Sequence, residues 1–209
     1  MRTFFLIMKL IAITTPYFFI EEDKIITALF EEGLDILHLR KPETCAMYSE
    51  RLLTLIPEKY HKKIVTHEHF YMKKEFGLMG IHLNSRNSKK PEEYEGHVSC
   101  SCHSIEEVKQ KKEIYDYVFM SPIFDSISKE GYNSQYTPEE LRKAAKEGII
   151  DNNVVALGGI TADNILQIKD FGFGGAALLG DIWGKFDFCN DENYLAIIKH
   201  FRKLKEIAD

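Results

Sequence analysis

Two apolar runs that end in glycine carry the residue types most suited to binding an anion. The run 154–157 stops at Gly158 and Gly159, and the run 174–179 stops at Gly180. Glycine allows a close backbone turn, and peptide N–H groups at such turns bind phosphate. The two runs therefore predict a phosphate site, although the same glycines would also suit plain tight turns between a strand and a helix.

Imidazole, guanidinium and hydroxyl side chains recur where the earlier apolar segments end. An arginine after an apolar strand suits phosphate or carboxylate, because its guanidinium donates through a rigid fork. A histidine there is either a proton shuttle near neutral pH or a hydrogen-bonded structural residue. The candidates are His38 and Arg40, the segment His67 to His69, His82 and Asn84, and Ser101 and His103.

Metal and lid alternatives remain open beside these assignments. Zinc binding by His67 with His69, or by Cys100 with Cys102, lacks a complete ligand set in the sequence. The segment 121–131 of a long polar loop is interpreted as a lid over a phosphate, and a solvated loop is the alternative. Its candidate contacts are Ser126, Ser128 and Lys129.

Alternating strands and helices are expected to position these side chains. Predicted strands cover 8–14, 36–40, 63–66, 80–83, 97–102 and 117–120, followed by the two glycine-ended runs; helices cover 21–32, 45–55, 70–76, 164–171 and 192–208. Two further helices are predicted to start at Ser104 and at Thr137 with Pro138. This order predicts a compact α/β fold, a single-domain (β/α)8 TIM barrel over 1–209, with residues 1–7 as a possible extension. A doubly wound open sheet is the alternative.

In a barrel the carboxyl ends of all strands lie on one face, so the polar residues are expected to meet there. Alternation along a strand puts His38 with Arg40 on one face, and Ser101 with His103. It sends Cys100 and Cys102 to the opposite face, where buried thiols are ordinary.

Composition narrows the class of protein. The 209 residues are 44% hydrophobic, enough for one substantial core, and the net charge is -5. Together with the lack of a basic run interleaved with aromatics, this charge argues against nucleic-acid binding. Four cysteines are too few for a disulfide scaffold, which favours a cytoplasmic location. We expect no membrane association, and a homodimer is possible.

Taken together, the motifs resemble the thiamine phosphate synthase and TenI family of thiamin biosynthesis. The resemblance runs from Met8 to about Ile182 and covers every predicted strand. No single motif is specific, but the set is. It comprises His38-Leu39-Arg40, Gly80-Ile81-His82-Leu83, Ser101-Cys102-His103, Asp116-Tyr117-Val118, Ser121-Pro122-Ile123-Phe124, Ser126-Ile127-Ser128-Lys129 and Leu157-Gly158-Gly159-Ile160.

Synthases of this family join a pyrimidine diphosphate to a thiazole phosphate and release magnesium-bound pyrophosphate. They carry Asn-Asp where this chain has His67-Glu68, and a second acidic ligand where Asn87 stands. Their lysine two residues after the arginine is replaced by Pro42, with Lys41 one place early. For a synthase, the resemblance implies Mg²⁺ as cofactor, held by Glu68 and Asn87.

TenI-type members tautomerise a thiazole carboxylate phosphate and need phosphate binding and a proton shuttle, without a cofactor. With a weakened metal set, we expect this tautomerase activity first, a thiamine-phosphate synthase as the alternative, and a non-catalytic phosphate-ligand binder or regulator as the third possibility. The resemblance implies His103 and His38 as catalytic residues and a phosphorylated thiazole as ligand. Its substrate-binding residues would be Arg40, Lys41, His67, His82, Ser101, Ser126, Ser128, Lys129, Gly158, Gly159, Gly180 and Asp181.

Overall fold

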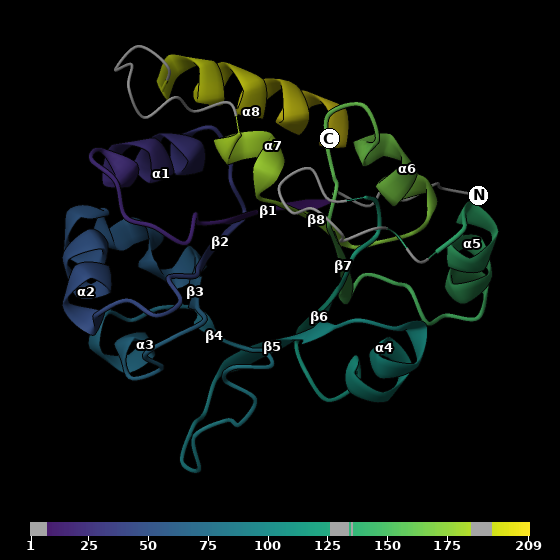
Figure 1. The fold of residues 1–209 in the computed structure, drawn as a ribbon, viewed down its shortest axis with the longest axis horizontal. Coiled ribbons are helices and arrows are strands. Elements are labelled where there is room, and N and C mark those ends of the chain that lie inside the picture. The colour runs from purple at the N-terminus through teal and green to yellow at the C-terminus, as the bar shows by residue number, and fades with distance from the viewer. Residues whose placement is uncertain (1–7, 126–133, 135, 185–193) are drawn as a thin grey trace.

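The chain forms a closed barrel of eight parallel strands, as the sequence predicts (Figure 1). The computed structural model describes residues 8–125, 134, 136–184 and 194–209. Each strand pairs with the next, and β8 closes onto β1 with Leu10 opposite Ala176, which excludes the open sheet. The strands are β1 (Lys9–Ile13), β2 (Ile36–Leu39), β3 (Ile64–Thr66), β4 (Gly80–Leu83), β5 (His97–Cys102), β6 (Tyr117–Met120), β7 (Val154–Leu157) and β8 (Gly175–Leu178).

Helices surround the barrel as an outer ring (Figure 1). Between β4 and β5 the chain makes an excursion, 84–96, that contains no helix. No helix within the described ranges is long and apolar enough to cross a membrane. The helices are α1 (Glu22–Glu31), α2 (Ala46–Leu55), the 3-10 helix η1 (Glu58–Lys63), α3 (Met72–Glu75), α4 (Ile105–Lys111), α5 (Pro138–Lys146), α6 (Ile165–Asp170), α7 (Gly180–Trp183) and α8 (Tyr194–Ala208).

Both predicted helix caps are confirmed. The Ser104 hydroxyl accepts a hydrogen bond from the Glu107 amide at 3.1 Å and starts α4 directly after β5. Thr137 and Glu140 form a reciprocal capping box at the start of α5, with Pro138 in the first helical position. These caps satisfy amides that a helix N-terminus would otherwise leave without partners.

Two apolar layers hold the barrel. The outer layer lies between strands and helices and includes Cys100 and Cys102, which confirms their predicted direction. The inner layer fills the barrel with β-branched and aromatic side chains, among them Val65, Tyr117 and Phe119. Among the described residues, packed side chains therefore fill the barrel interior, and a ligand site is expected at the carboxyl ends of the strands.

Candidate active site

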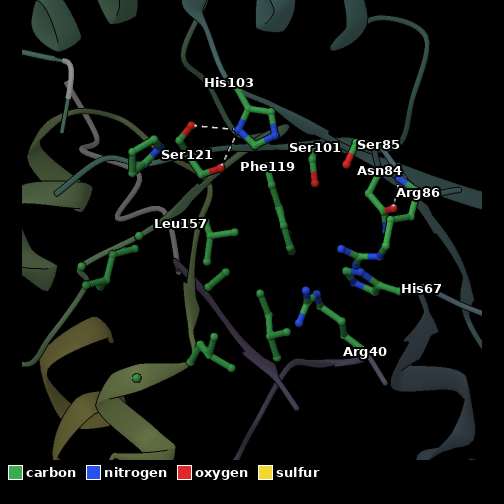
Figure 2. Close-up of a pocket in the computed structure, with 18 residues that line it drawn as sticks. Arg40, His67, Asn84, Ser85, Arg86, Ser101, His103, Phe119, Ser121 and Leu157 are labelled. Carbon is green, nitrogen blue, oxygen red and sulfur yellow. Dashed lines mark hydrogen bonds between the residues drawn. The ribbon is translucent and has the colours of Figure 1, made fainter. Parts of the chain in front are cut away.

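A cavity of about 270 Å³ lies at the carboxyl ends of the strands (Figure 2). This volume is near the lower end of the range for small-molecule sites, roughly 300–1,000 Å³. Residues from several strands meet there, as the barrel topology predicts. Its polar and glycine lining comprises Arg40, His67, Asn84, Ser85, Arg86, Ser101, His103, Ser121, Gly158, Gly159 and Gly180.

One wall of the cavity is built from glycines after β7 and β8. Gly158 and Gly159 have positive φ angles of 101° and 64°, which favour glycine. A Cβ on Gly159 would lie 2.2 Å from the carbonyl oxygen of Asp125, so the segment after β6 also requires glycine here. The carbonyl oxygens of Gly158 and Gly159 accept hydrogen bonds from Phe124 and Asn164. Because both carbonyl oxygens accept hydrogen bonds from the protein, they point away from an anion bound at this wall and do not repel it.

A second wall carries two guanidinium groups. Arg40 follows β2 and Arg86 follows β4, and Figure 2 shows both projecting at the same side, away from Leu157 on the glycine wall. Partial burial, followed by the positive charge of Arg86, lowers the pKa of Arg40. Two like charges held this close favour an anionic ligand between or beside them.

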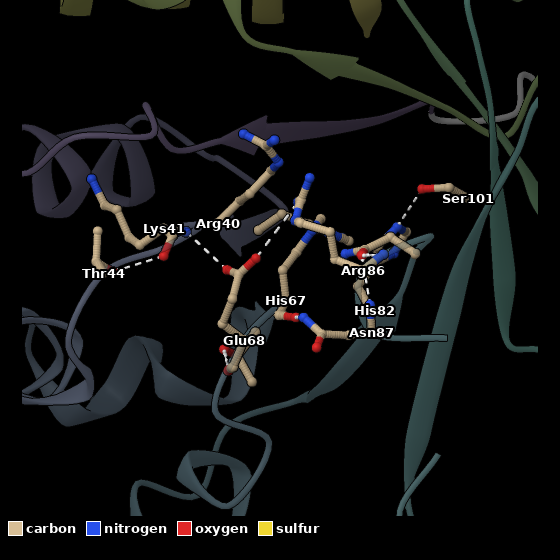
Figure 3. Close-up of polar contacts among 12 residues, drawn as sticks. Arg40, Lys41, Thr44, His67, Glu68, His82, Arg86, Asn87 and Ser101 are labelled. Atoms are coloured by element: carbon tan, nitrogen blue, oxygen red, sulfur yellow. Dashed lines mark hydrogen bonds and ion pairs between the residues drawn. The ribbon is translucent and has the colours of Figure 1, made fainter. Parts of the chain in front are cut away.

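Glu68 lies beside the Arg86 guanidinium (Figure 3). Its Oε2 accepts the Lys41 backbone N–H at 2.9 Å, and its Oε1 is 3.7 Å from Arg86 Nη2. Oε1 is buried and has no hydrogen-bond partner among the described residues. A carboxylate oxygen of this kind is available to a divalent cation, and Mg²⁺ often binds through one or two carboxylates plus substrate phosphates. Asn87 contributes less, because its side-chain amide donates to the His67 carbonyl oxygen at 2.9 Å.

Lys41 does not line the cavity. Its side chain is 1% exposed, and its Nζ forms an ion pair with Glu22 Oε1, at the start of α1, at 2.5 Å. The same Nζ donates to the Tyr17 carbonyl oxygen at 2.7 Å and lies over the Phe18 ring. Burial raises the pKa of Glu22 to about 7 and lowers the pKa of Lys41. The lysine therefore holds the loop after β1 and is not in a position to bind substrate.

Three histidines lie in and directly below the cavity. His38 and His82 are fully buried inside the barrel, whereas His67 is 4% exposed and reaches the lining. Burial holds the pKa of all three well below the ordinary histidine value, with His82 lowered to about 3. His38, predicted as catalytic, and His82, predicted to bind substrate, are thus neutral groups beneath the cavity floor.

Hydrogen bonds already use most nitrogens of this histidine group. His38 Nδ1 is 2.8 Å from His67 Nε2, and both nitrogens of His82 are 2.8 Å from serine hydroxyls. Their possible ligand atoms lie within 4.8 Å of one another. The rings of His67 and His82 are nevertheless stacked, with centroids 4.3 Å apart and planes at 23°. Stacked rings direct their nitrogens along parallel planes, which does not favour one shared ion.

The remaining predicted residues divide between the cavity and other positions. His103 is exposed at the rim, with Nδ1 3.3 Å from the Ser121 hydroxyl and carbonyl oxygens. Asp181 is buried away from the cavity and 2.6 Å from His200 Nε2. The predicted contacts Ser126, Ser128 and Lys129 lie outside the described residues.

Arg86, Ser85 and Ser121 line the cavity but were not among the predicted site residues. Arg86 had a readable signal, because it follows β4 at the same end of the barrel as Arg40. Ser121 ends β6 in the same way. A search for polar residues directly after every predicted strand would have identified both Arg86 and Ser121.

The fold and the cavity define this chain as a (β/α)8 barrel whose cavity has two walls suited to anions. Comparison with known proteins identifies the family, because the model described as thiamine monophosphate synthase matches residues 10–182. The chain belongs to the thiamine monophosphate synthase family. The predicted resemblance is confirmed.

Individual relatives agree with this assignment. A thiamine-phosphate synthase from Halalkalibacterium halodurans is 28% identical over 192 residues, covering 86% of this chain and 89% of that protein. A thiamine phosphate pyrophosphorylase from Bacteroides thetaiotaomicron has a crystal structure that is 72% identical, with a TM-score of 0.91 and 97% and 98% coverage. A thiamine phosphate pyrophosphorylase from Pyrococcus furiosus is 18% identical with a TM-score of 0.74, covering 97% and 96%, and supports the fold alone.

Proposed function

We propose that this chain is a thiamine-phosphate synthase, which joins a hydroxymethylpyrimidine diphosphate to a thiazole phosphate and releases pyrophosphate. The observation that carries the proposal is the presence of two anion-suited walls in one cavity, one made of glycines and the other of Arg40 and Arg86. A reaction between two phosphorylated substrates requires two such places. Relatives with the same fold and high coverage bear the names thiamine-phosphate synthase and thiamine phosphate pyrophosphorylase.

The glycine wall is assigned to the thiazole phosphate. Backbone N–H groups at Gly159 and Gly180 would bind a monophosphate without the help of a side chain. This arrangement would hold the thiazole ring toward the middle of the cavity. Its ring nitrogen then faces the pyrimidine methylene carbon, with which it forms the new C–N bond.

The arginine wall is assigned to the diphosphate. As the C–O bond to the pyrimidine breaks, the electron pair stays with the departing pyrophosphate, whose negative charge increases. Arg40 and Arg86 can donate several hydrogen bonds to these oxygens, which stabilises the leaving group more than the bound substrate. His38 and His82 below the cavity floor are neutral, so the positive charge of this wall comes from the two arginines.

Magnesium is part of this proposal. Glu68 Oε1, buried and without a hydrogen-bond partner in the described part of the chain, is the ligand atom that fits Mg²⁺, and diphosphate oxygens and water would complete the shell. When bound, the ion would neutralise charge on the leaving pyrophosphate. Arg86 beside Glu68 supplies further positive charge to the same ligand.

Two other functions stay in competition. A TenI-type tautomerase would use His103, which lies at the cavity rim, and needs only one phosphate site; the carboxylate of its substrate is then the one further anion for the two guanidiniums. A non-catalytic binder would bind phosphorylated ligands at both walls and convert neither of them. The names of the relatives favour the synthase over both.

The test is a steady-state assay of the purified protein with both substrates and Mg²⁺, following thiamin phosphate by fluorescence after oxidation. We expect product and pyrophosphate in equal amounts. Thiazole tautomerisation with no coupled product would support the tautomerase, and binding of both ligands with neither reaction would support the non-catalytic binder.

A further inference from the structure

A continuous chain of hydrogen bonds runs through the interior of the barrel below the cavity. It begins at His67 Nε2, which lies 2.8 Å from His38 Nδ1, and continues from His38 Nε2 to the Tyr117 hydroxyl at 2.6 Å. Tyr117 is hydrogen-bonded in turn to Ser99. From Ser99 the chain continues to His82, whose Nδ1 is 2.8 Å from the Ser99 hydroxyl.

The last link brings the chain back to the cavity. His82 Nε2 is 2.8 Å from the hydroxyl of Ser101, and Figure 2 shows that hydroxyl pointing into the cavity. His67 at the other end also belongs to the lining. Every interior member is almost completely buried, so water does not replace any of these bonds.

Such a chain has two self-consistent directions when all its members are neutral. Each imidazole carries one proton, so the direction of one hydrogen bond sets the next through the ring. In the first direction, each of the three histidines carries its proton on Nε2 and Ser101 accepts from His82. In the second direction, each carries its proton on Nδ1 and Ser101 donates to His82. Burial keeps the pKa of His38 and His82 low and raises that of Tyr117, which favours neutral members.

The His67 end decides between the two directions. His67 Nδ1 is buried and has no hydrogen-bond partner among the residues that the structure describes. The positive charges of Arg40 and Arg86 act on this ring. A proton on Nδ1 would be an unsatisfied buried donor near two cations, whereas a lone pair there is attracted to them. The first direction is therefore the more stable one.

We propose that this buried chain fixes the Ser101 hydroxyl as a hydrogen-bond donor into the cavity, by holding His38, His67 and His82 in their Nε2–H tautomers. Because the Ser101 hydroxyl oxygen accepts a hydrogen bond from His82 Nε2–H, its own proton is free to point at the ligand. The cavity then selects a ligand with an acceptor, such as an aromatic ring nitrogen or a carbonyl oxygen, opposite Ser101. A ligand presenting an N–H there is rejected, because two donors would face each other.

His38 and His82 act as positioning residues, and Ser101 is the member of the chain that donates a hydrogen bond to the ligand. The direction of these hydrogen bonds is a property of the ligand-free protein. It therefore does not depend on whether the enzyme is a synthase or a tautomerase.

The direct test is long-range ¹H–¹⁵N correlation NMR of the full chain labelled at histidine, which distinguishes protonated from unprotonated ring nitrogens. We expect His38, His67 and His82 each to be neutral with the proton on Nε2, unchanged between pH 6 and 8. Nδ1–H tautomers at the three residues, a mixture of directions, or a protonated ring would each overturn the proposal.

Tyr117→Phe tests the coupling between the two ends. This variant removes the link between His38 and Ser99, so His82 is expected to populate both tautomers. Tyr60→Phe is the matched control, because Tyr60 is also buried but packs on Phe30, outside the network. A pure Nε2–H state of His82 in Tyr117→Phe would refute the coupling. If Tyr117→Phe does not fold, the tautomers of the unaltered protein decide alone.

Discussion

Replacing Arg40 with alanine removes one of the two guanidiniums on the diphosphate wall. A hydrogen bond to a charged partner contributes about 1.5–3 kcal/mol, and 1.4 kcal/mol corresponds to a tenfold change in affinity. We therefore expect pyrophosphate to bind roughly 10- to 150-fold more weakly to Arg40→Ala. The Arg86 side chain is 43% exposed, so solvent screens its charge and Arg86→Ala should cost less, below about tenfold.

The assay is isothermal titration calorimetry with two ligands, pyrophosphate plus Mg²⁺ and thiazole phosphate. Thiazole phosphate should bind both variants with unchanged affinity, because its phosphate lies at the glycine wall. Arg142→Ala is the control, since Arg142 is an exposed arginine paired with Glu139 outside the cavity. Equal weakening of both ligands, or none in Arg40→Ala, would refute the separation of the two walls.

Three further substitutions test other parts of the account. Glu68→Ala should weaken Mg²⁺ binding measured in the presence of pyrophosphate, and an unchanged magnesium titration would remove Glu68 as a ligand. Lys41→Met leaves the buried Glu22 without its cation and should lower the free energy of unfolding by about 3–5 kcal/mol near pH 8. Burial raises the pKa of Glu22 above its unfolded value although Lys41 lowers it, and loss of the lysine raises it further, so this variant should regain stability as the pH falls from 8 to 5 and the native carboxyl takes up a proton. A flat pH profile in denaturant titrations would contradict this. Gly159→Ala should lower both stability and thiazole phosphate affinity, whereas Gly77→Ala, with the same φ of 64° but open space around it, should lose only the backbone contribution of about 1 kcal/mol or more. Equal losses in the two glycine variants would show that the contact with the loop is unimportant.

The sequence was sufficient for the barrel because the signals for it are local. Short apolar runs, glycines after them and capping residues such as Ser104 and Thr137 are set by neighbours in the chain. The predicted strand 80–83 and the predicted strand 117–120 have the same bounds in the structure. Local patterns of this kind fix element type and order, and the closed parallel barrel then follows from strand and helix alternation.

The site was predicted less completely because its details depend on contacts between distant segments. Lys41 is held by Glu22, from a different helix, and nothing in its local sequence indicates that pairing. His38 and His82 do face the barrel interior as alternation predicts, but their depth below the cavity depends on the register between strands. The position of Arg86 after β4 marks it as a candidate, but periodicity gives no direction for its side chain in the irregular excursion 84–96.

The most direct test of the central claim is whether the cavity binds two anions at once. Pyrophosphate with Mg²⁺ would be titrated calorimetrically into the protein alone and into the protein saturated with thiazole phosphate. Two separate walls predict one pyrophosphate bound per chain, with an affinity that thiazole phosphate leaves unchanged or improves. Competition between the two ligands, with pyrophosphate affinity falling in proportion to thiazole phosphate concentration, would contradict the account.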